Sequence, residues 1–123
     1  MTTEAIGTSY ARTGGLERVT GALQYLADIR LNDVLQVKLV HLDVARARIL
    51  SIDTSEAEAV PGVRCVMTAA DLPDPMPRFG PHAQDRPVLA VDQVNFHGEF
   101  LAAVAAETRE AAEEAARLVK VEY

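Results

Sequence analysis

The amino-acid sequence predicts an α+β fold in a single domain. Residues 45–67 and 100–123 each follow the order strand, helix, strand, and the remaining predicted strands are separated only by short turns. This mixture of helical and turn-connected segments is typical of α+β proteins. A chain of 123 residues can bury one hydrophobic core, and its 49% hydrophobic and 24% charged residues match an ordinary globular domain.

Charge and composition argue against two kinds of partner. The formal net charge of −6 makes the surface repel phosphate backbones, and the aromatic residues that stack on bases make up only 5%. We therefore expect no nucleic-acid partner. The longest apolar run, residues 100–106, is much shorter than the roughly 20 residues of a membrane-spanning helix, so we expect no membrane partner either.

Two features of the sequence favour a cytoplasmic protein. Residues 1–15 have neither the basic start nor the apolar centre of an export signal. Cys65 is the single cysteine, so no disulfide can form within the chain, as is usual in a reducing compartment. One cysteine also cannot build a cysteine-ligated zinc or iron–sulfur site by itself.

The first third of the chain changes from irregular to strand-like. Residues 1–18 hold three glycines among small polar residues and show no periodicity, which predicts a flexible N-terminal arm before a folded domain over 19–123. A turn sequence then leads into a predicted strand over 23–29. Residues 34–42 alternate between apolar and polar side chains, and this period of two predicts a half-buried strand.

The apolar side chains of residues 45–53 change face part-way along the segment. Ala47 and Ile49 are apolar at odd positions, whereas Leu50 and Ile52 are apolar at even positions. A strand cannot move its apolar side chains to the other face without a bulge or a sharp twist. We therefore predict a break at Ile49 and Leu50, where the chain passes from one packing layer to another.

Capping patterns predict the two short helices that follow. Ser55 and Glu58 have the spacing of a capping box, and they predict a short helix that stops at Pro61. Thr68 and Asp71 repeat the pattern and predict a single helical turn.

The C-terminal half contains the most hydrophobic segments. Residues 63–67 read as a buried strand, and residues 100–106 are apolar throughout, which predicts a central strand covered on both faces. Thr108 is the expected cap of a helix over 109–118 that carries an alanine stripe on one face and charges on the other. A strand over 119–123 is expected to follow.

Residues 73–87 hold five of the six prolines and therefore cannot form a helix or an inner strand. Long irregular segments in small domains are often functional or face a partner. A plain solvated connection explains this segment equally well. Short edge strands are expected over 87–91 and 94–96.

The sequence displays no set of residues typical of an active site. The three histidines, His41, His82 and His97, are far apart in the sequence. This spacing favours ordinary packing or surface roles over a metal site. Cys65 has apolar neighbours and is expected to be buried and unreactive. Four neighbouring polar residues could be taken for part of a nucleophilic site, but helix capping explains their presence better. They are Ser51, Asp53, Thr54 and Ser55. We expect no catalytic, cofactor-binding or metal-binding residue in this chain.

The polar triplet His97-Gly98-Glu99 comes directly before the most hydrophobic predicted strand. Three interpretations are open: a simple turn, a structural hydrogen-bonding role for Glu99, or a role at an interface.

Several short motifs occur in an order and spacing that resemble those of a known family. They are Arg18-Val19-Thr20-Gly21 with Tyr25 and Asp28, Ala47-Arg48-Ile49 with Ile52-Asp53, Pro61-Gly62-Val63 with Val66, Thr68 and Asp71, Gly98-Glu99, and Val119-Lys120-Val121-Glu122-Tyr123. Together they span about residues 12–123 and resemble the N-terminal domain of the large subunit of xanthine dehydrogenases and aldehyde oxidases, which are molybdenum hydroxylases.

The resemblance implies an α/β-hammerhead fold, a mixed sheet with two main helices. It also implies an oxidoreductase that hydroxylates a heterocycle, an aldehyde or a similar carbon. In that family a molybdopterin bound by later domains supplies the chemistry, and iron–sulfur clusters and often FAD carry the electrons. The family's molybdenum-binding loops and catalytic glutamate lie beyond the positions matched here, so the resemblance assigns no cofactor to this chain itself.

Three departures from the family pattern leave the subfamily and the substrate open. Leu23 stands where alanine is usual, Leu42-Asp43-Val44-Ala45-Arg46 lacks the family's two histidines, and Phe100 replaces a proline.

The sequence supports three functional hypotheses. The first is a structural domain that packs on downstream molybdopterin-binding domains and an iron–sulfur subunit or domain, in an enzyme that can also form a homo-oligomer. The second is a free-standing binding or assembly module of the same fold without activity, and the third is a small-molecule sensor. Because the sequence stops at Tyr123 within a predicted strand, we expect a fragment of a larger subunit, with partner-facing apolar surface near Tyr123 and the Pro-rich segment.

Overall fold

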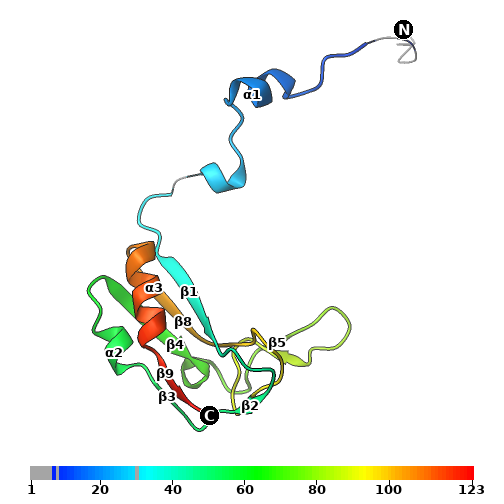
Figure 1. The fold of residues 1–123 in the computed structure, drawn as a ribbon. Helices are drawn as coiled ribbons and strands as arrows, with labels where there is room; N and C mark the ends of the chain where they lie inside the picture. Colours follow the sequence, from blue (N-terminus) through cyan, green and yellow to red (C-terminus); the bar gives the residue numbers. More distant parts are fainter. Residues whose placement is uncertain (1–6, 8, 30) are drawn as a thin grey trace. The chain divides into compact units, whose positions relative to one another are not determined.

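The computed structural model describes residues 7, 9–29 and 31–123. Its contacts divide the chain into two units, Met1–Asp33 and Val34–Tyr123. The first unit contains helix α1 (Gly15–Thr20) and the 3-10 turn η1 (Leu26–Asp28), and the second contains the sheets and the hydrophobic core (Figure 1).

The first unit differs from its prediction. Part of the expected N-terminal arm is helical in α1, and the strand predicted over 23–29 is wrong. The chain forms η1 there because the Asp28 carboxylate accepts the backbone N–H of Tyr25 at 2.9 Å, which closes a turn instead of leaving the backbone extended. Residues 1–6 and 8 of the predicted arm lie outside the described residues.

Three strands form the main sheet of the second unit, in the order β1 (Gln36–His41), β8 (Phe100–Ala106), β4 (Val63–Thr68). Strands are therefore present where they were predicted over 34–42 and 100–106, and β8 is central, as expected. The half-burial predicted for 34–42 is wrong, because Leu35, Val37 and Leu39 are exposed and Val40 is the buried residue of β1. The pairings among the described residues are all antiparallel, so strand directions are not mixed as the resemblance implied.

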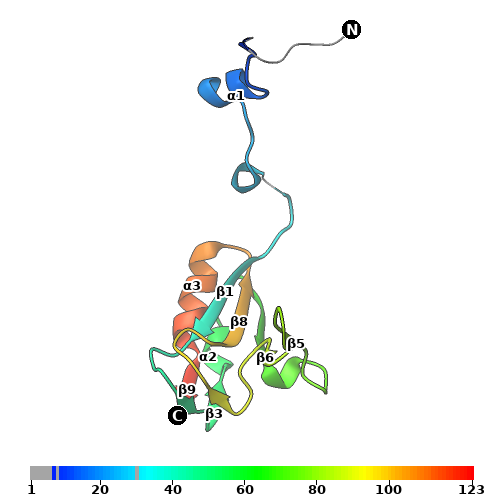
Figure 2. The same cartoon turned by 90° about the vertical axis from the view of Figure 1, so that its right-hand side faces the viewer.

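Helix α3 (Arg109–Leu118) packs on one face of this sheet, and the two lie against each other in Figures 1 and 2. The hydroxyl of Thr108 accepts the backbone N–H of Ala111 at 3.2 Å, which confirms the predicted cap. Ala112 and Ala115 are buried, and their small side chains let the helix backbone approach the sheet closely. The hydrophobic core of the second unit is a cluster of buried residues, namely Val40, Ala57, Val60, Ala90, Val94, Leu101, Ala102, Val104 and Ala115.

The opposite face of the main sheet is only partly covered. Ala103 and Ala105 are half-buried, and Val37 beside them is 61% exposed, so the prediction that β8 is covered on both faces is wrong along this stretch. The register shifts between Val63 and Cys65. Because of this irregularity Val66 packs against the core and Cys65 is exposed, contrary to the predicted buried thiol.

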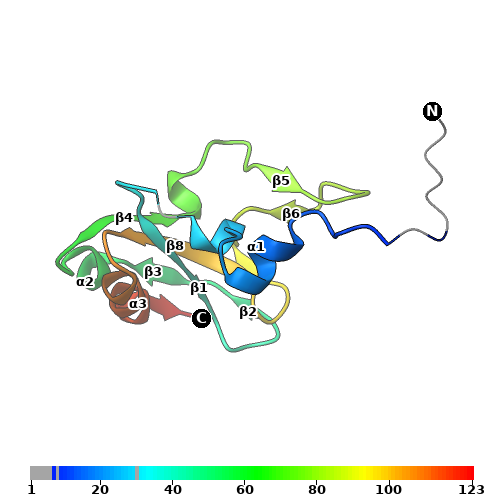
Figure 3. The ribbon, with the colours of Figure 1, turned by 90° about the horizontal axis from the view of Figure 1, so that it is seen from above.

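The predicted break at Ile49 and Leu50 is confirmed. Strand β2 (Ala47–Arg48) pairs with β7 (Gln93–Val94), whereas β3 (Ser51–Asp53) pairs with β9 (Lys120–Glu122). The two intervening residues thus carry the chain from one sheet into another, as the change of apolar face requires. Figure 3 shows β2 and β3 in succession along the chain, seen from above.

The capping predictions have different outcomes. The Asp71 carboxylate accepts the backbone N–H of Thr68 at 2.7 Å and its hydroxyl at 3.0 Å, which confirms the cap of η2 (Ala69–Asp71). The predicted pairing of Ser55 with Glu58 is wrong, although helix α2 (Ser55–Glu58) exists. Asp53, at the end of β3, takes both the N–H and the hydroxyl of Ser55.

The Pro-rich segment folds back on itself as a two-stranded ribbon, β5 (Arg78–Phe79) with β6 (Arg86–Pro87). The ribbon forms a separate sheet, which agrees with the predicted lack of an inner strand. The edge strands expected over 87–91 and 94–96 are shorter and shifted, to β6 and β7. Phe79 in the ribbon and Tyr123 at the end of the chain are exposed, as predicted for partner-facing surface.

Matched valine substitutions test the two faces of the main sheet. Val104→Ala removes buried methyl groups beneath α3 and is expected to lower the free energy of unfolding by about 2 kcal/mol or more. Val37→Ala, on the neighbouring strand but exposed, is expected to cost less than about 1 kcal/mol. Urea denaturation of both variants measures the difference, and equal losses would contradict the assignment of the two faces.

Acid unfolding tests the cap of η2. The backbone and hydroxyl hydrogen bonds from Thr68 hold the pKa of Asp71 below its ordinary value. A carboxyl group whose pKa is lower in the folded than in the unfolded protein stabilises the fold. This stabilisation is complete above the pKa of the unfolded protein, about 3.9, and is lost as the pH falls through the lower pKa of the folded protein. Asp71→Asn is therefore expected to be less stable than the parent near neutral pH, with a difference that shrinks in acid. A difference that does not change with pH would contradict this account.

Candidate functional site

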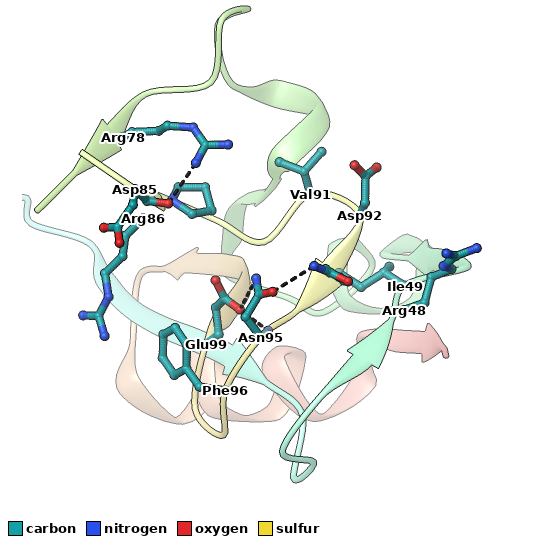
Figure 4. A pocket seen from close by; sticks show the side chains of 12 residues that line it. Arg48, Ile49, Arg78, Asp85, Arg86, Val91, Asp92, Asn95, Phe96 and Glu99 are labelled. Atoms are coloured by element: carbon teal, nitrogen blue, oxygen red, sulfur yellow. Dashed lines mark hydrogen bonds between the residues drawn. The ribbon is translucent and has the colours of Figure 1, made fainter. Parts of the chain in front are cut away.

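The unit Val34–Tyr123 contains a hollow of about 920 Å³. It lies between the β5–β6 ribbon, strand β2 and the segment that leads from β6 into β8 (Figure 4). Apolar side chains such as Ile49 and Phe96 form part of the lining. The charged side chains of the lining are Arg48, Arg78, Asp85, Arg86, Asp92 and Glu99.

Glu99 is the buried charged residue of this site, with 6% of its surface exposed. Gly98, with a φ of 84°, turns the chain just before it. One carboxylate oxygen, Oε2, accepts the backbone N–H of Asn95 at 2.5 Å and its side-chain amide at 3.3 Å. Gln93 in turn donates to the amide oxygen of Asn95 at 2.9 Å. These bonds confirm the structural hydrogen-bonding role that was one of the three interpretations of Glu99.

The second carboxylate oxygen of Glu99, Oε1, has no hydrogen-bond partner among the described residues. It points away from Asn95 in Figure 4. Within the described part of the chain, no sealed side-chain oxygen or nitrogen lacks a partner, so Oε1 remains accessible. The site therefore presents a hydrogen-bond acceptor on a buried negative charge.

The three arginines of the hollow are held differently. Arg78 donates to the backbone carbonyl of Asp85 at 2.8 Å, and the guanidinium of Arg86 lies 4.9 Å from the centre of the Phe96 ring. Arg48 has no acidic partner among the residues that the structure describes. The lining thus contains three arginines and three carboxylates, so it offers both donors and acceptors to a group that enters the hollow.

The fold brings two of the three histidines close together, although the sequence predicted only separate packing or surface roles for them. The rings of His41 and His97 lie 6.1 Å apart, and Nε2 of His97 lies 2.9 Å from the Asp43 carboxylate. No sequence pattern indicated this proximity, because β1 and the β7–β8 connection meet only through strand pairing. Over residues 7, 9–29 and 31–123, no three histidine, cysteine or acidic side chains are grouped as metal ligands.

The hydroxyl residues considered as nucleophiles are hydrogen-bonded to carboxylates, and the capping role predicted for Ser51 is wrong. Ser51 donates to the Glu122 carboxylate across the β3–β9 pair at 3.0 Å, and Thr54 donates to Glu58 at 2.6 Å. Ser55 is held by Asp53, whose pKa is lowered mainly by the Ser55 hydroxyl. Each of the three hydroxyls is thus hydrogen-bonded to a carboxylate close to a strand pair or to the start of α2.

Residues 20–123 match the family model described as "Aldehyde oxidase and xanthine dehydrogenase, a/b hammerhead domain". The chain belongs to this hammerhead family. The recognition based on its motifs is thereby confirmed, as is the α/β-hammerhead fold.

Curated relatives of this hammerhead domain include subunits of dehydrogenases. The chain is 42% identical over 115 residues to a probable xanthine dehydrogenase subunit of Bacillus subtilis (strain 168), covering 94% of this chain and 15% of that protein. It is 33% identical over 120 residues to the nicotinate dehydrogenase large molybdopterin subunit of Eubacterium barkeri, covering 98% of this chain and 28% of that protein. The hammerhead domain thus spans less than a third of the length of these relatives.

Solved structures show the same fold. Quinoline 2-oxidoreductase from Pseudomonas putida 86 superposes with a TM-score of 0.86 at 36% identity, over 99% of this chain and 16% of the other. The aldehyde oxidoreductase from Desulfovibrio desulfuricans ATCC 27774 superposes with a TM-score of 0.82 at 31% identity, over 94% of this chain and 14% of the other. The hammerhead domain is accordingly a domain type of molybdenum hydroxylase large subunits.

The hollow does not fit the molybdopterin that the family implies. A phosphate-bearing pterin would meet Asp85, Asp92 and the buried Glu99 beside the arginines, and among the described residues no helix N-terminus lines the hollow to receive an anion. We therefore assign no molybdopterin contact to the hollow. Across the described residues, no helix has the length and apolar character needed to cross a membrane.

Substitutions at Glu99 test its role in closing the turn before β8. Glu99→Leu leaves the backbone N–H of Asn95 without its acceptor and is expected to lower the free energy of unfolding by about 1–3 kcal/mol. Glu99→Gln keeps an acceptor oxygen and is expected to lose less. Glu114→Leu, on the exposed side of α3, serves as the control in urea denaturation. A Glu99→Leu variant as stable as this control would refute the structural role.

Proposed function

We propose that the chain is the structural N-terminal hammerhead domain of a molybdenum hydroxylase large subunit, and that it supports the molybdopterin-binding domains of that subunit. The observation that carries this proposal is the match of nearly the whole chain to relatives of which it covers only about 15% to 28%. The chain accounts for a small share of the length of these relatives, and its described side chains form a hollow of mixed charge. Both features favour a structural role, with the catalytic site in other domains of the subunit.

Substrate choice also belongs to other parts of the enzyme under this proposal. The relatives are named for xanthine, nicotinate, quinoline, aldehydes and carbon monoxide, yet all carry this domain with identities of 31% to 42%. A domain shared by enzymes for such different molecules supports a common scaffold role. The chain is thus expected to work beside molybdopterin, iron–sulfur clusters and FAD without holding them, in a cytoplasmic enzyme with an iron–sulfur subunit or domain.

The domain boundary proposed for this scaffold runs over residues 19–123, behind an N-terminal arm of residues 1–18. The family match over residues 20–123 supports the boundary. Residues 20–33 belong to the first unit, so this stretch is proposed to connect the arm to the sheets.

A free-standing assembly module is the second candidate. The observation in its favour is that the unit Val34–Tyr123 contains its own buried core. The half-covered face of the main sheet, where Val37 and Met67 are exposed, favours the scaffold role instead, because exposed apolar surface of this kind usually meets a partner.

Recovery of the native protein tests the proposed function. Antibodies against this chain are used to purify the protein from its source cells, and the product is analysed by mass spectrometry, molybdenum content and pterin fluorescence. We expect peptides of this chain in a protein several times larger than 13.3 kDa that holds about one molybdenum per large subunit. Recovery of a 13.3 kDa protein without molybdenum would contradict the scaffold role and favour the free-standing module.

A further inference from the structure

We propose that the hollow around Glu99 is a docking socket for a protein segment from the rest of the large subunit, and that this segment donates a hydrogen bond to Oε1 of Glu99. The inference rests on the proposed function and deepens it by naming the surface and the chemistry of the contact. The starting observation is Glu99, the buried carboxylate among the described residues, whose Oε2 is hydrogen-bonded and whose Oε1 has no partner within those residues.

One oxygen of the largely buried Glu99 carboxylate is still reached from the hollow. Every sealed side-chain oxygen and nitrogen of the described residues has a partner, so Oε1 is accessible and can accept a hydrogen bond from whatever fills the hollow. In Glu99, 6% exposed, Oε2 is satisfied by Asn95 and Oε1 is not bonded within the described residues. Since Oε1 opens into the hollow, a donor that enters the hollow is the group that would complete it.

The charge pattern favours a protein segment over a small molecule. An anionic ligand would be attracted by Arg48 but repelled by Glu99, and an apolar ligand would cover both charges without bonding to either. A polypeptide loop carries both N–H donors and acceptor oxygens, so it can donate to Glu99 and also accept from an arginine of the lining. The ring of Phe96 and the side chain of Ile49 also line the hollow and offer apolar contact.

The rest of the same large subunit is the occupant that the relatives favour. This chain covers 15% of the Bacillus subtilis protein and 16% of the quinoline 2-oxidoreductase chain, so most of each relative lies outside the matched domain. A segment that is part of the same polypeptide is present at a high effective concentration and can dock without high intrinsic affinity. That suits a hollow whose lining combines a few charged anchors with limited apolar area.

Photo-crosslinking in the native protein that contains this chain tests the socket. Phe96 is replaced by p-benzoylphenylalanine, and cross-linked peptides are identified by mass spectrometry. We expect cross-links to one segment of the same large subunit beyond the matched domain. Cross-links confined to this chain, to another protein, to a second copy or to a small molecule would overturn the proposal, as would a lack of cross-links in a folded, molybdenum-containing protein.

Glu99→Gln in the same protein tests the anchor without disrupting the turn. The glutamine oxygen replaces Oε2 as the acceptor for Asn95, which places an amide donor where Oε1 faced the incoming donor. Cross-linking yield is expected to fall about tenfold while the melting temperature changes little. Glu114→Gln, on an exposed helix position, is the matched control and is expected to leave the yield unchanged.

An unchanged yield in Glu99→Gln would overturn the role of Glu99. The outcomes also separate this inference from the proposed function. A molybdenum-containing large subunit in which Phe96 does not cross-link to another segment refutes the socket alone, whereas a 13.3 kDa protein without molybdenum refutes both.

Discussion

The packing of α3 against the central strand β8 is the interaction on which the rest of the structure depends. Ala112 and Ala115 of the helix are buried, as are Ala102 and Val104 of the strand, and small side chains of this kind let the helix lie close to the sheet. Strand β8 is held on both sides by β1 and β4, so the helix fixes all three strands at once. The same strand begins next to Glu99, and its position therefore sets the geometry of the hollow.

Much of this core could be predicted from the sequence because local rules and tertiary packing agree there. The apolar run of β8, the alanine stripe of α3 and the cap at Thr108 each point to the observed element. The change of apolar face at Ile49 and Leu50 was also informative, since only a switch of sheets can satisfy it.

The errors lie where one side-chain contact or one strand irregularity decides the outcome. The Asp28 carboxylate closes a turn where a strand was predicted. The Ser55 hydroxyl donates to Asp53, so Ser55 does not form the predicted capping pair with Glu58. The irregular register of β4 exposes Cys65, which alternation alone had placed inside. The hollow as a whole was not predictable, because its lining comes from segments far apart in sequence. The polar triplet at Glu99 and the Pro-rich segment over 73–87 each marked part of it.

A scaffold role explains why a well-packed core coexists with surfaces that remain incomplete. The open face of the sheet and the free oxygen of Glu99 are features that a larger protein can cover. The most direct test is a structure of the whole native protein that contains this chain. The account predicts a segment of the same large subunit in the hollow, with a donor within hydrogen-bond distance of Glu99 and the molybdenum site in other domains. A hollow filled by the cofactor, or left open to solvent in the assembled enzyme, would contradict it.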